Sequence, residues 1–381
     1  MKLFDKAIRL VPTFIFAIAI AVSPANVNAE DALVMELRAM AKDHVLPLVE
    51  KRGGGAIAVG GFTPATSVKG GAGPEVQLKL SEILQQLNAK INADDYRFEI
   101  TGNYLPYDDR DSGLQGVKLV GRLVDAEDGT TLGEFPRFVF GPEAVPRLLG
   151  LSVSTKGSND AQTQSNAFRK ALKSPKPFFV GNNISATPVS EYAVEVLTLN
   201  GRQYHPCRVS QDNKSRPFVH IEKNSVYAVR LVNHSNREAA VKLTIDGVNA
   251  FQFSQQTPRP QYWIVPPKKN GKPGVTVVRG WDKSDSRSIE FKVVDFPHSA
   301  AARVNLQPSP GIGLITATFS ACWEYERDRP RSEGRTRATG FGKEIVDRKT
   351  RVKRHIGRVR DVVSIRYERP QVTTGPFVTS R

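Results

Sequence analysis

The residue types that most often carry chemistry in proteins are few in this chain and form no recognisable motif. Its six histidines are His44, His205, His220, His234, His298 and His355. None has the H-E-x-x-H or H-x-x-x-H spacing that places two imidazoles on one face of a helix. The segment His205-Pro206-Cys207 offers two metal ligands, but a zinc site takes four, or three and a water. We therefore expect no metal site.

Two groups of aspartates could do chemistry if the fold brought their members together. Asp246 and Asp295 could form the carboxylate pair of a glycoside hydrolase. Both lie at the ends of predicted strands, however, where aspartate usually forms a turn. Asp108, Asp109 and Asp111 could hold Ca²⁺, but they miss the D-x-D-x-D-G spacing and its closing Glu. A solvated turn is the better interpretation of that segment.

Motifs for covalent or phosphate chemistry are missing as well. A strand at 56–59, a Gly-rich loop at 60–73 and a helix follow one another in the order of a phosphate-binding loop. No Gly-Lys-Ser/Thr ending and no G-x-G-x-x-G opens that helix, and the chain contains no G-x-S-x-G elbow. We expect a protein that is not an enzyme, with no catalytic residue and no cofactor.

Aromatic residues give the sequence an alternative function. Trp263, Trp281 and Trp323, with Tyr262 and Tyr325, all fall in the β-rich half of the chain. In an exposed row they would stack on sugar rings, which would make the protein a carbohydrate-binding or carbohydrate-active β-sandwich. Each tryptophan also lies in or beside a predicted strand, where aromatic side chains commonly fill the core. Core packing is the favoured interpretation.

The first residues predict export. Lys2, Lys6 and Arg9 precede the apolar run at 14–22, and Val27-Asn28-Ala29 fits a leader-peptidase site. Nine apolar residues span only about 14 Å as a helix, less than half of a bilayer core. We expect cleavage after Ala29 rather than an uncleaved anchor, no transmembrane segment in the mature chain, and a periplasmic or secreted protein.

Export bears on the only two cysteines, Cys207 and Cys322. An oxidising compartment would allow a disulfide between them. Such a bond would close a loop of more than 100 residues, worth up to about 4–5 kcal/mol in the chain-entropy model. Two buried free thiols fit the spacing equally well, so the sequence leaves both alternatives open.

Positive charge is concentrated at the C-terminus. The chain carries a formal charge of +16, and from residue 327 onward it has 16 Lys and Arg against 6 Asp and Glu. This segment could contact an anionic cell-wall or membrane surface or an envelope protein, or it could be a solvated edge with no specific partner. Export argues against nucleic acid. The candidate contact residues are Arg348, Lys349, Arg351, Lys353, Arg354, Arg358 and Arg360.

Hydrophobic periodicity sets out the elements that would position these residues. Helical spacing covers 31–50, with Asp31 as cap, and a second apolar stripe runs through 76–91. Around these helices, strands are expected at 56–59, 97–104, 116–124 and 135–140. Helices on one small sheet make an α+β layer.

The second half of the chain is dominated by period-two alternation. The segment Ser225–Val248 reads as two strands around a turn at 234–237, with Asp246-Gly247 as the next reversal. We expect this hairpin at the centre of an antiparallel β-sandwich, since many short strands at regular spacing favour that fold. The fold class is thus α+β, with a small α/β domain followed by a β-sandwich.

Composition suggests the boundaries. We expect a leader at 1–29, the α/β domain at 30–150 and a polar linker at 151–185 that contains one short helix. The sandwich should cover 186–326. The basic tail at 327–381 should end in a β-hairpin that joins the sandwich.

Two regions of the chain resemble known protein domains. The segment AIAVGGFTPATSVKGGAGPEVQLKLSEILQQL, followed by ITGNYLPYDDRDSGLQGVKLVGRLVDAEDG, resembles the small α/β domain of TolB N-terminal regions, CsgG and penicillin-binding-protein activator lipoproteins. The chain lacks the lipid-anchor Cys of many of those proteins. The later segments VYAVRLVN, VKLTIDGVNAF, YWIVPP and GIGLITATF are similar to an uncharacterised bacterial exported β-domain. These resemblances imply fold and an envelope setting, and no catalytic residues.

We therefore expect an exported, non-enzymatic binding or scaffold protein of the bacterial cell envelope. It would act by contact with another protein or with an anionic surface. The alternative is the carbohydrate-binding or carbohydrate-active sandwich described above.

Overall fold

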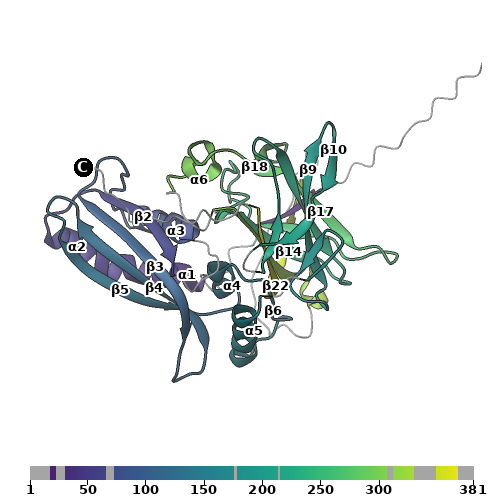
Figure 1. The fold of residues 1–381 in the computed structure, drawn as a ribbon, viewed down its shortest axis with the longest axis horizontal. Helices are drawn as coiled ribbons and strands as arrows, with labels where there is room; N and C mark the ends of the chain where they lie inside the picture. Colours follow the sequence, from purple (N-terminus) through teal and green to yellow (C-terminus); the bar gives the residue numbers. More distant parts are fainter. Residues whose placement is uncertain are drawn as a thin grey trace, which may run out of the picture.

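The computed structural model describes residues 18–22, 31–65, 73–175, 178–212, 215–306, 312–329 and 349–367. Over these residues the protein is a mixed α+β structure, as the coarser part of the expected fold class predicts. A helix-covered four-stranded sheet lies at one end of the molecule and a larger β assembly at the other. The helices α4 (Ala144–Leu149) and α5 (Ala161–Lys173) lie between them (Figure 1).

The smaller part is a sheet in the order β2-β3-β4-β5. Its strands are β2 (Ile57–Pro64), β3 (Phe98–Asp108), β4 (Gln115–Asp125) and β5 (Thr131–Val139). β2 and β3 are parallel and are connected through α3 (Gly73–Gln86), whereas the other pairs are antiparallel. The first helical run comprises α1 (Ala32–Met40), a π-helical turn (Ala41–Val45) and α2 (Leu46–Lys51). The expected cap is present, because Asp31 Oδ1 accepts the backbone N–H of Leu33 at 3.1 Å.

The larger part contains two sheets. The first has the order β11-β12-β22-β20-β14-β16-β1-β21, with β15 on β14 and β6 on β22. Its strands are β1 (Ile18–Val22), β6 (Val153–Ser154), β11 (Val209–Gln211), β12 (Pro217–Val219), β14 (Ala239–Ile245), β15 (Val248–Asn249), β16 (Tyr262–Val265), β20 (Leu314–Trp323), β21 (Lys349–Lys353) and β22 (His355–Arg366).

The second sheet has the order β18-β19-β13-β9-β8-β7, with β10 on β9 and β17 on β13. Its strands are β7 (Phe178–Val180), β8 (Asn183–Ser185), β9 (Tyr192–Asn200), β10 (Gln203–Pro206), β13 (Val226–Asn233), β17 (Gly274–Val278), β18 (Gly280–Ser284) and β19 (Arg287–Lys292). A short helix, α6 (Ala300–Arg303), precedes β20.

The expected central hairpin is wrong in one respect: β13 and β14 form at the predicted residues but do not pair. β13 pairs with β9 and β17, and β14 pairs with β16 and β20. The fully buried Asn233, at the end of β13, holds the connection to β14 in place. Its Nδ2 donates to the carbonyls of Arg237 (2.7 Å) and Pro266 (3.0 Å). The Asp246-Gly247 turn is formed, with both residues at positive φ, and it connects β14 to β15.

Two hydrophobic cores meet on shared elements. On α3, Leu78 belongs to the core of the large β assembly, whereas Val76 and Leu80 belong to the α/β core. On β22, Val362 points into the α/β core and the next residue, Val363, into the other. A single helix and a single strand therefore connect both cores.

The segments expected as linker and tail take part in these cores. α5 buries Phe168 in the α/β core, and β6 pairs with β22. The tail strands do not form the expected hairpin, because β22 pairs with β20 and β21 pairs with β1. Within the expected leader the structure describes only β1, and the predicted cleavage site at 27–29 lies outside the described residues.

Candidate functional site

A cluster of buried charges lies where the α/β layer meets the large β assembly. It consists of two cations and three carboxylates from four separate places in the chain: Asp31, Glu75, Glu143 with Arg147, and Lys242. We call it the Arg147 cluster. Asp31 caps α1, Glu75 lies in the first turn of α3, and Lys242 comes from β14. The cluster therefore joins elements of both halves of the protein.

Arg147 is the hub, and its side chain is 1% exposed. Its Nε donates to Glu75 Oε2 at 2.8 Å, one terminal nitrogen donates to Glu143 Oε1 at 2.8 Å, and the other to Asp31 Oδ2. Lys242 Nζ donates to the same Glu143 oxygen and also lies 5.8 Å from the Tyr262 ring. Each charged group thus has an opposite charge beside it, which offsets the cost of burial.

The three carboxylates do not have equal proton affinities. Burial opposes ionisation of Asp31, but the charges of Arg147 and Lys242 outweigh it and lower its pKa to about 2. Glu75 is 4% exposed; burial raises its pKa above the ordinary value in spite of Arg147, and the negative charge of Asp31 adds to the rise. As the pH falls, Glu75 therefore takes up a proton before Asp31 does.

A cleft of about 900 Å³ opens beside the cluster. Asp31, Glu75 and Lys242 of the cluster are among its lining residues. One wall is α3 and the other is the segment that follows β14, through β15 to Gln261. We call it the junction cleft. Its volume lies within the range of small-ligand and peptide sites.

Carboxamides dominate the lining of the junction cleft. Gln85 and Gln86 come from α3. From the opposite wall come Asn249, Gln252, Gln255, Gln256 and Gln261. Each carboxamide offers both donors and an acceptor. The lining thus matches an uncharged ligand that itself alternates donors and acceptors.

The remaining charges of the lining are tied together across the cleft. Lys79 Nζ pairs with Glu82 Oε2 at 2.8 Å, both on α3. Gln252 Nε2 donates to Glu82 Oε1 at 3.2 Å from the other wall, and Arg259 donates to Gln252 Oε1 at 3.4 Å. This chain of contacts sets the spacing between the walls.

One polar atom of the lining has no partner. Gln256 is 9% exposed, and its Nε2 donates to Asp282 Oδ2 at 3.3 Å. Its Oε1 is buried and accepts no hydrogen bond among the described residues. A buried amide oxygen without a donor costs free energy, on the order of 1–3 kcal/mol.

The turn of Asp246-Gly247 holds the two walls together at their base. A Cβ on Gly247 would lie 2.6 Å from the backbone N of Glu75, so only glycine permits this approach. Asp246 Oδ1 accepts the backbone N–H groups of Gly313 (2.7 Å) and Leu314 (3.1 Å), and the Tyr367 hydroxyl donates to its Oδ2 at 2.6 Å. Asp246 is therefore a structural carboxylate.

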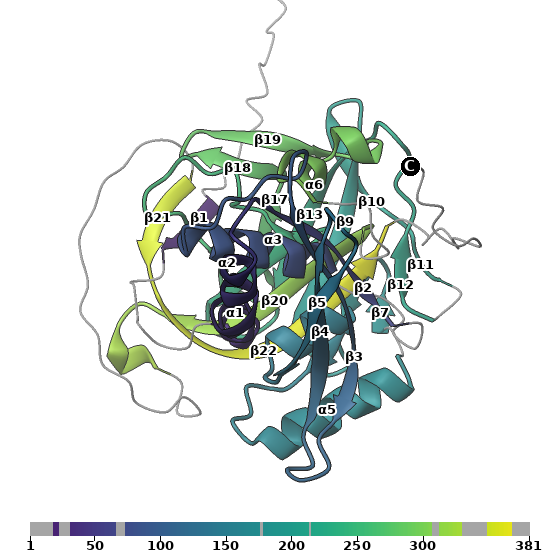
Figure 2. The same cartoon turned by 90° about the vertical axis from the view of Figure 1, so that its left-hand side faces the viewer.

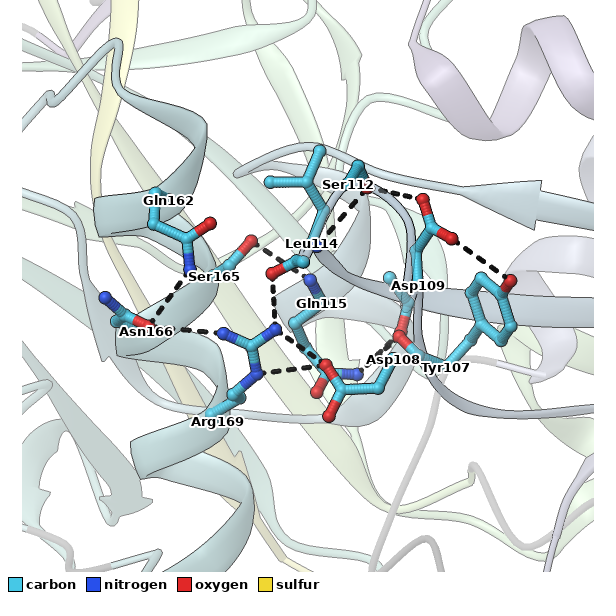
Figure 3. A network of polar contacts seen from close by, with 12 residues as sticks. Tyr107, Asp108, Asp109, Ser112, Leu114, Gln115, Gln162, Ser165, Asn166 and Arg169 are labelled. Carbon is cyan, nitrogen blue, oxygen red and sulfur yellow. Dashed lines mark hydrogen bonds and ion pairs between the residues drawn. The ribbon is translucent and has the colours of Figure 1, made fainter.

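The other aspartates considered for chemistry have local roles too. Asp295 is exposed and pairs with Lys223 at 2.6 Å. Asp108 accepts from Arg169 of α5 at 2.7 Å, and Asp109 accepts from Ser112 (Figure 3). The hairpin end carrying Asp108 is thus fastened to α5, as the backbone N–H of Gln115 also donates to Ser165 Oγ at 3.0 Å. Among the described residues, no group of His, Cys, Asp or Glu has the arrangement of a metal site.

The tryptophans and cysteines are buried. Trp263, Trp281 and Trp323 are 1%, 9% and 7% exposed, so none offers a stacking surface to a sugar. Cys207 and Cys322 are free thiols, and burial raises the pKa of both. Of the two alternatives left open by the sequence, the structure holds the buried thiols.

Several candidate residues of the basic tail are engaged within the chain. Arg351 Nε lies 3.3 Å from Asp285 Oδ1, and Arg354 pairs with Glu238 and, at 3.7 Å, with Glu324. Arg360 donates to the backbone carbonyl of Lys156 at 3.0 Å. Lys349 and Lys353 lie in β21 and Arg358 in β22. Arg348 lies outside the described residues.

The comparisons with known proteins give no further guide. Searches among protein families, curated proteins and solved structures found no match. Across the described part of the chain, no helix is both long and apolar enough to cross a membrane.

Proposed function

We propose that this chain is an exported, non-enzymatic binding protein of the bacterial cell envelope. Its ligand in this proposal is an extended segment of another envelope protein, held in the junction cleft. The leader sequence and the resemblance of the N-terminal region to envelope domains support the setting. The observation that carries the binding site is the cleft itself, about 900 Å³ in volume, with seven carboxamide side chains in its lining.

A polypeptide fits this lining better than a charged ligand does. Every peptide unit offers one N–H and one C=O, which carboxamide side chains on two walls can match. Apart from Arg259, which contacts the Gln252 amide, the charged groups beside the cleft are paired with one another, so a charged ligand would gain little from them. An extended backbone would exchange hydrogen bonds with carboxamides of both walls.

The same pairing argues against catalysis in the cleft. Arg147 and Lys242 hold the nearby carboxylates in ion pairs. Among the described residues that line the cleft there is no His or Cys to act as base or nucleophile. For the carbohydrate alternative, the three buried tryptophans offer no stacking surface, although Tyr325 is 52% exposed.

Site-specific photo-crosslinking in the cell tests the proposal. A photoreactive residue replaces Gln255, which lines the cleft and is exposed, or Gln162, which is exposed on α5 away from it. We expect a discrete protein adduct at position 255, none at 162, and loss of the adduct when Gln256→Leu is added. Equal adducts at both positions, or an adduct that is indifferent to Gln256→Leu, would count against the proposal. A glycan adduct instead of a protein would favour the carbohydrate alternative.

A further inference from the structure

The segment Ile18–Val22 occupies a place in the large sheet as β1. It runs antiparallel to β16, with Ala19 opposite Ile264 and Ala21 opposite Tyr262. On its other side it runs parallel to β21, with all five residues in register from Lys349 to Lys353. Figure 2 shows β1 beside β21 at the margin of the sheet.

β21 has no other strand partner among the described residues, and β16 has only β14 on its other side. If the leader is removed after Ala29, as the proposed function requires, β1 leaves with it. The backbone groups of β16 and β21 that faced β1 then have no ladder partner. A sheet edge in that condition pairs readily with another extended chain.

Ion pairs made by two arginines hold β21 in place independently of β1. Arg351 is paired with Asp285, next to the end of β18. Arg354, 11% exposed, directly follows β21 and pairs with Glu238 and Glu324 at the ends of β14 and β20. β22 then continues the chain along β20. The two sides of the gap therefore stay positioned when β1 is gone, and we call this gap the strand slot.

The slot also has an apolar lining. Ala240, Ile264 and Cys322 form a small buried cluster, and Tyr262, Val352 and Ile356 pack against it. Ile264 and Tyr262 belong to β16 and Val352 to β21, so members of the cluster lie on both sides of the slot. The residues of β1 in register with them are Ala19 and Ala21.

We propose that the processed protein binds, in the strand slot, an extended uncharged segment of another polypeptide. This segment adds a strand antiparallel to β16 and parallel to β21. The seated sequence IAIAV sets its chemistry: about five apolar residues, with small side chains at alternate positions opposite Tyr262 and Ile264. Backbone pairing supplies the affinity and the alternate side chains the selectivity. The inference rests on the export that the proposed function includes, but it concerns a different surface from the junction cleft.

A disulfide trap tests the slot. The probe is a synthetic peptide of residues 16–24 with Ala21→Cys and a polar solubility tag. The protein is the processed chain purified from the cell envelope, carrying either Tyr262→Cys or, as matched control, Ile289→Cys on the exposed strand β19. The native thiols are buried, and the unmodified protein reports any reaction at them.

We expect the peptide to cross-link at position 262 at least about tenfold faster than at 289, since only position 262 lies in register with residue 21. A tenfold difference corresponds to about 1.4 kcal/mol, of the order of one or two backbone hydrogen bonds. A competing peptide without the cysteine should block the reaction, and the same competitor with Ile20→Pro should block it about tenfold less well.

Equal cross-linking at 262 and 289, or none at 262, overturns the strand slot while leaving the junction cleft untouched. Mass spectrometry of the cellular protein separates the remaining cases. An N-terminus at Met1 refutes both the export proposal and the slot, because β1 then fills the gap itself. A dimer that the peptide dissociates also overturns the inference, since the occupant would then be a second copy of this chain.

Discussion

Arg147→Met is the substitution that most severely tests the junction between the two halves of the protein. Methionine keeps much of the side-chain volume but removes the cation from among Asp31, Glu75 and Glu143. Glu143 retains Lys242, whereas Glu75 loses its ion-pair partner in a site where it is 4% exposed. Removing one partner from a buried ion pair typically costs about 3–5 kcal/mol of unfolding free energy. We expect a loss in that range.

Urea unfolding followed by two signals measures the loss. The tryptophans all lie in the large β assembly, so fluorescence reports on that core, whereas far-UV circular dichroism reports on both. Because α3 and β22 contribute side chains to both cores, we expect the two signals to shift together.

The matched control is Arg169→Met. Arg169 also binds a carboxylate, Asp108, at 2.7 Å, but both side chains are more exposed, at 24% and 62%. An exposed pair contributes about 0–1 kcal/mol. If Arg147→Met lowers the free energy of unfolding no more than Arg169→Met does, the Arg147 cluster does not stabilise the junction as described. Partial recovery by adding Glu75→Gln would show that the unpaired carboxylate is the cause.

Three further predictions follow from the same contacts. Arg147 and Lys242 lower the pKa of Asp31 to about 2, so ionised Asp31 contributes about 2 kcal/mol to the free energy of unfolding above pH 4. This contribution is lost as the pH falls towards 2. In urea unfolding measured at a series of pH values, Asp31→Asn should remove the fall of the midpoint over that range. Glu75 has a raised pKa, so its contribution is present below about pH 4.5 and is lost as the pH rises; Glu75→Gln should remove this decline, and an unchanged profile would contradict the assignment. Gly247→Ala should lower the free energy of unfolding by more than about 1 kcal/mol, because the turn needs positive φ and the new Cβ would lie 2.6 Å from Glu75 N. The control is Gly271→Ala, whose Cβ would meet nothing within 4 Å. It should lose only the free energy needed to hold alanine at positive φ.

The hydrophobic periodicity of the sequence was enough to predict where helices and strands lie, but not which strands pair with each other. Asp31 as helix cap, the stripe of α3 and the Asp246-Gly247 turn are local features, and the structure contains all three. Strand pairing depends on contacts far along the chain. The sequence suggested that β13 would pair with β14, but the two strands belong to different sheets. The buried amide of Asn233 holds the connection between them by donating to the Arg237 carbonyl.

The site was harder to predict for the same reason. The Arg147 cluster assembles residues separated by up to 211 positions, as Asp31 and Lys242 show. Only Glu143 and Arg147 have a local signal, the i,i+4 spacing of a helical ion pair. The carboxamides of the junction cleft are ordinary surface residue types, and nothing in their spacing reveals that two distant segments face each other.

In the proposed function, the junction cleft binds a polypeptide through its carboxamides. Calorimetric titration of the processed protein with the segment recovered by cross-linking at position 255 tests it most directly. Gln256→Leu, which removes one of the seven carboxamides of the cleft, should weaken the affinity about tenfold, as expected for loss of one hydrogen bond, while Gln162→Ala should leave it unchanged. Equal affinities for the wild-type protein and Gln256→Leu would contradict it.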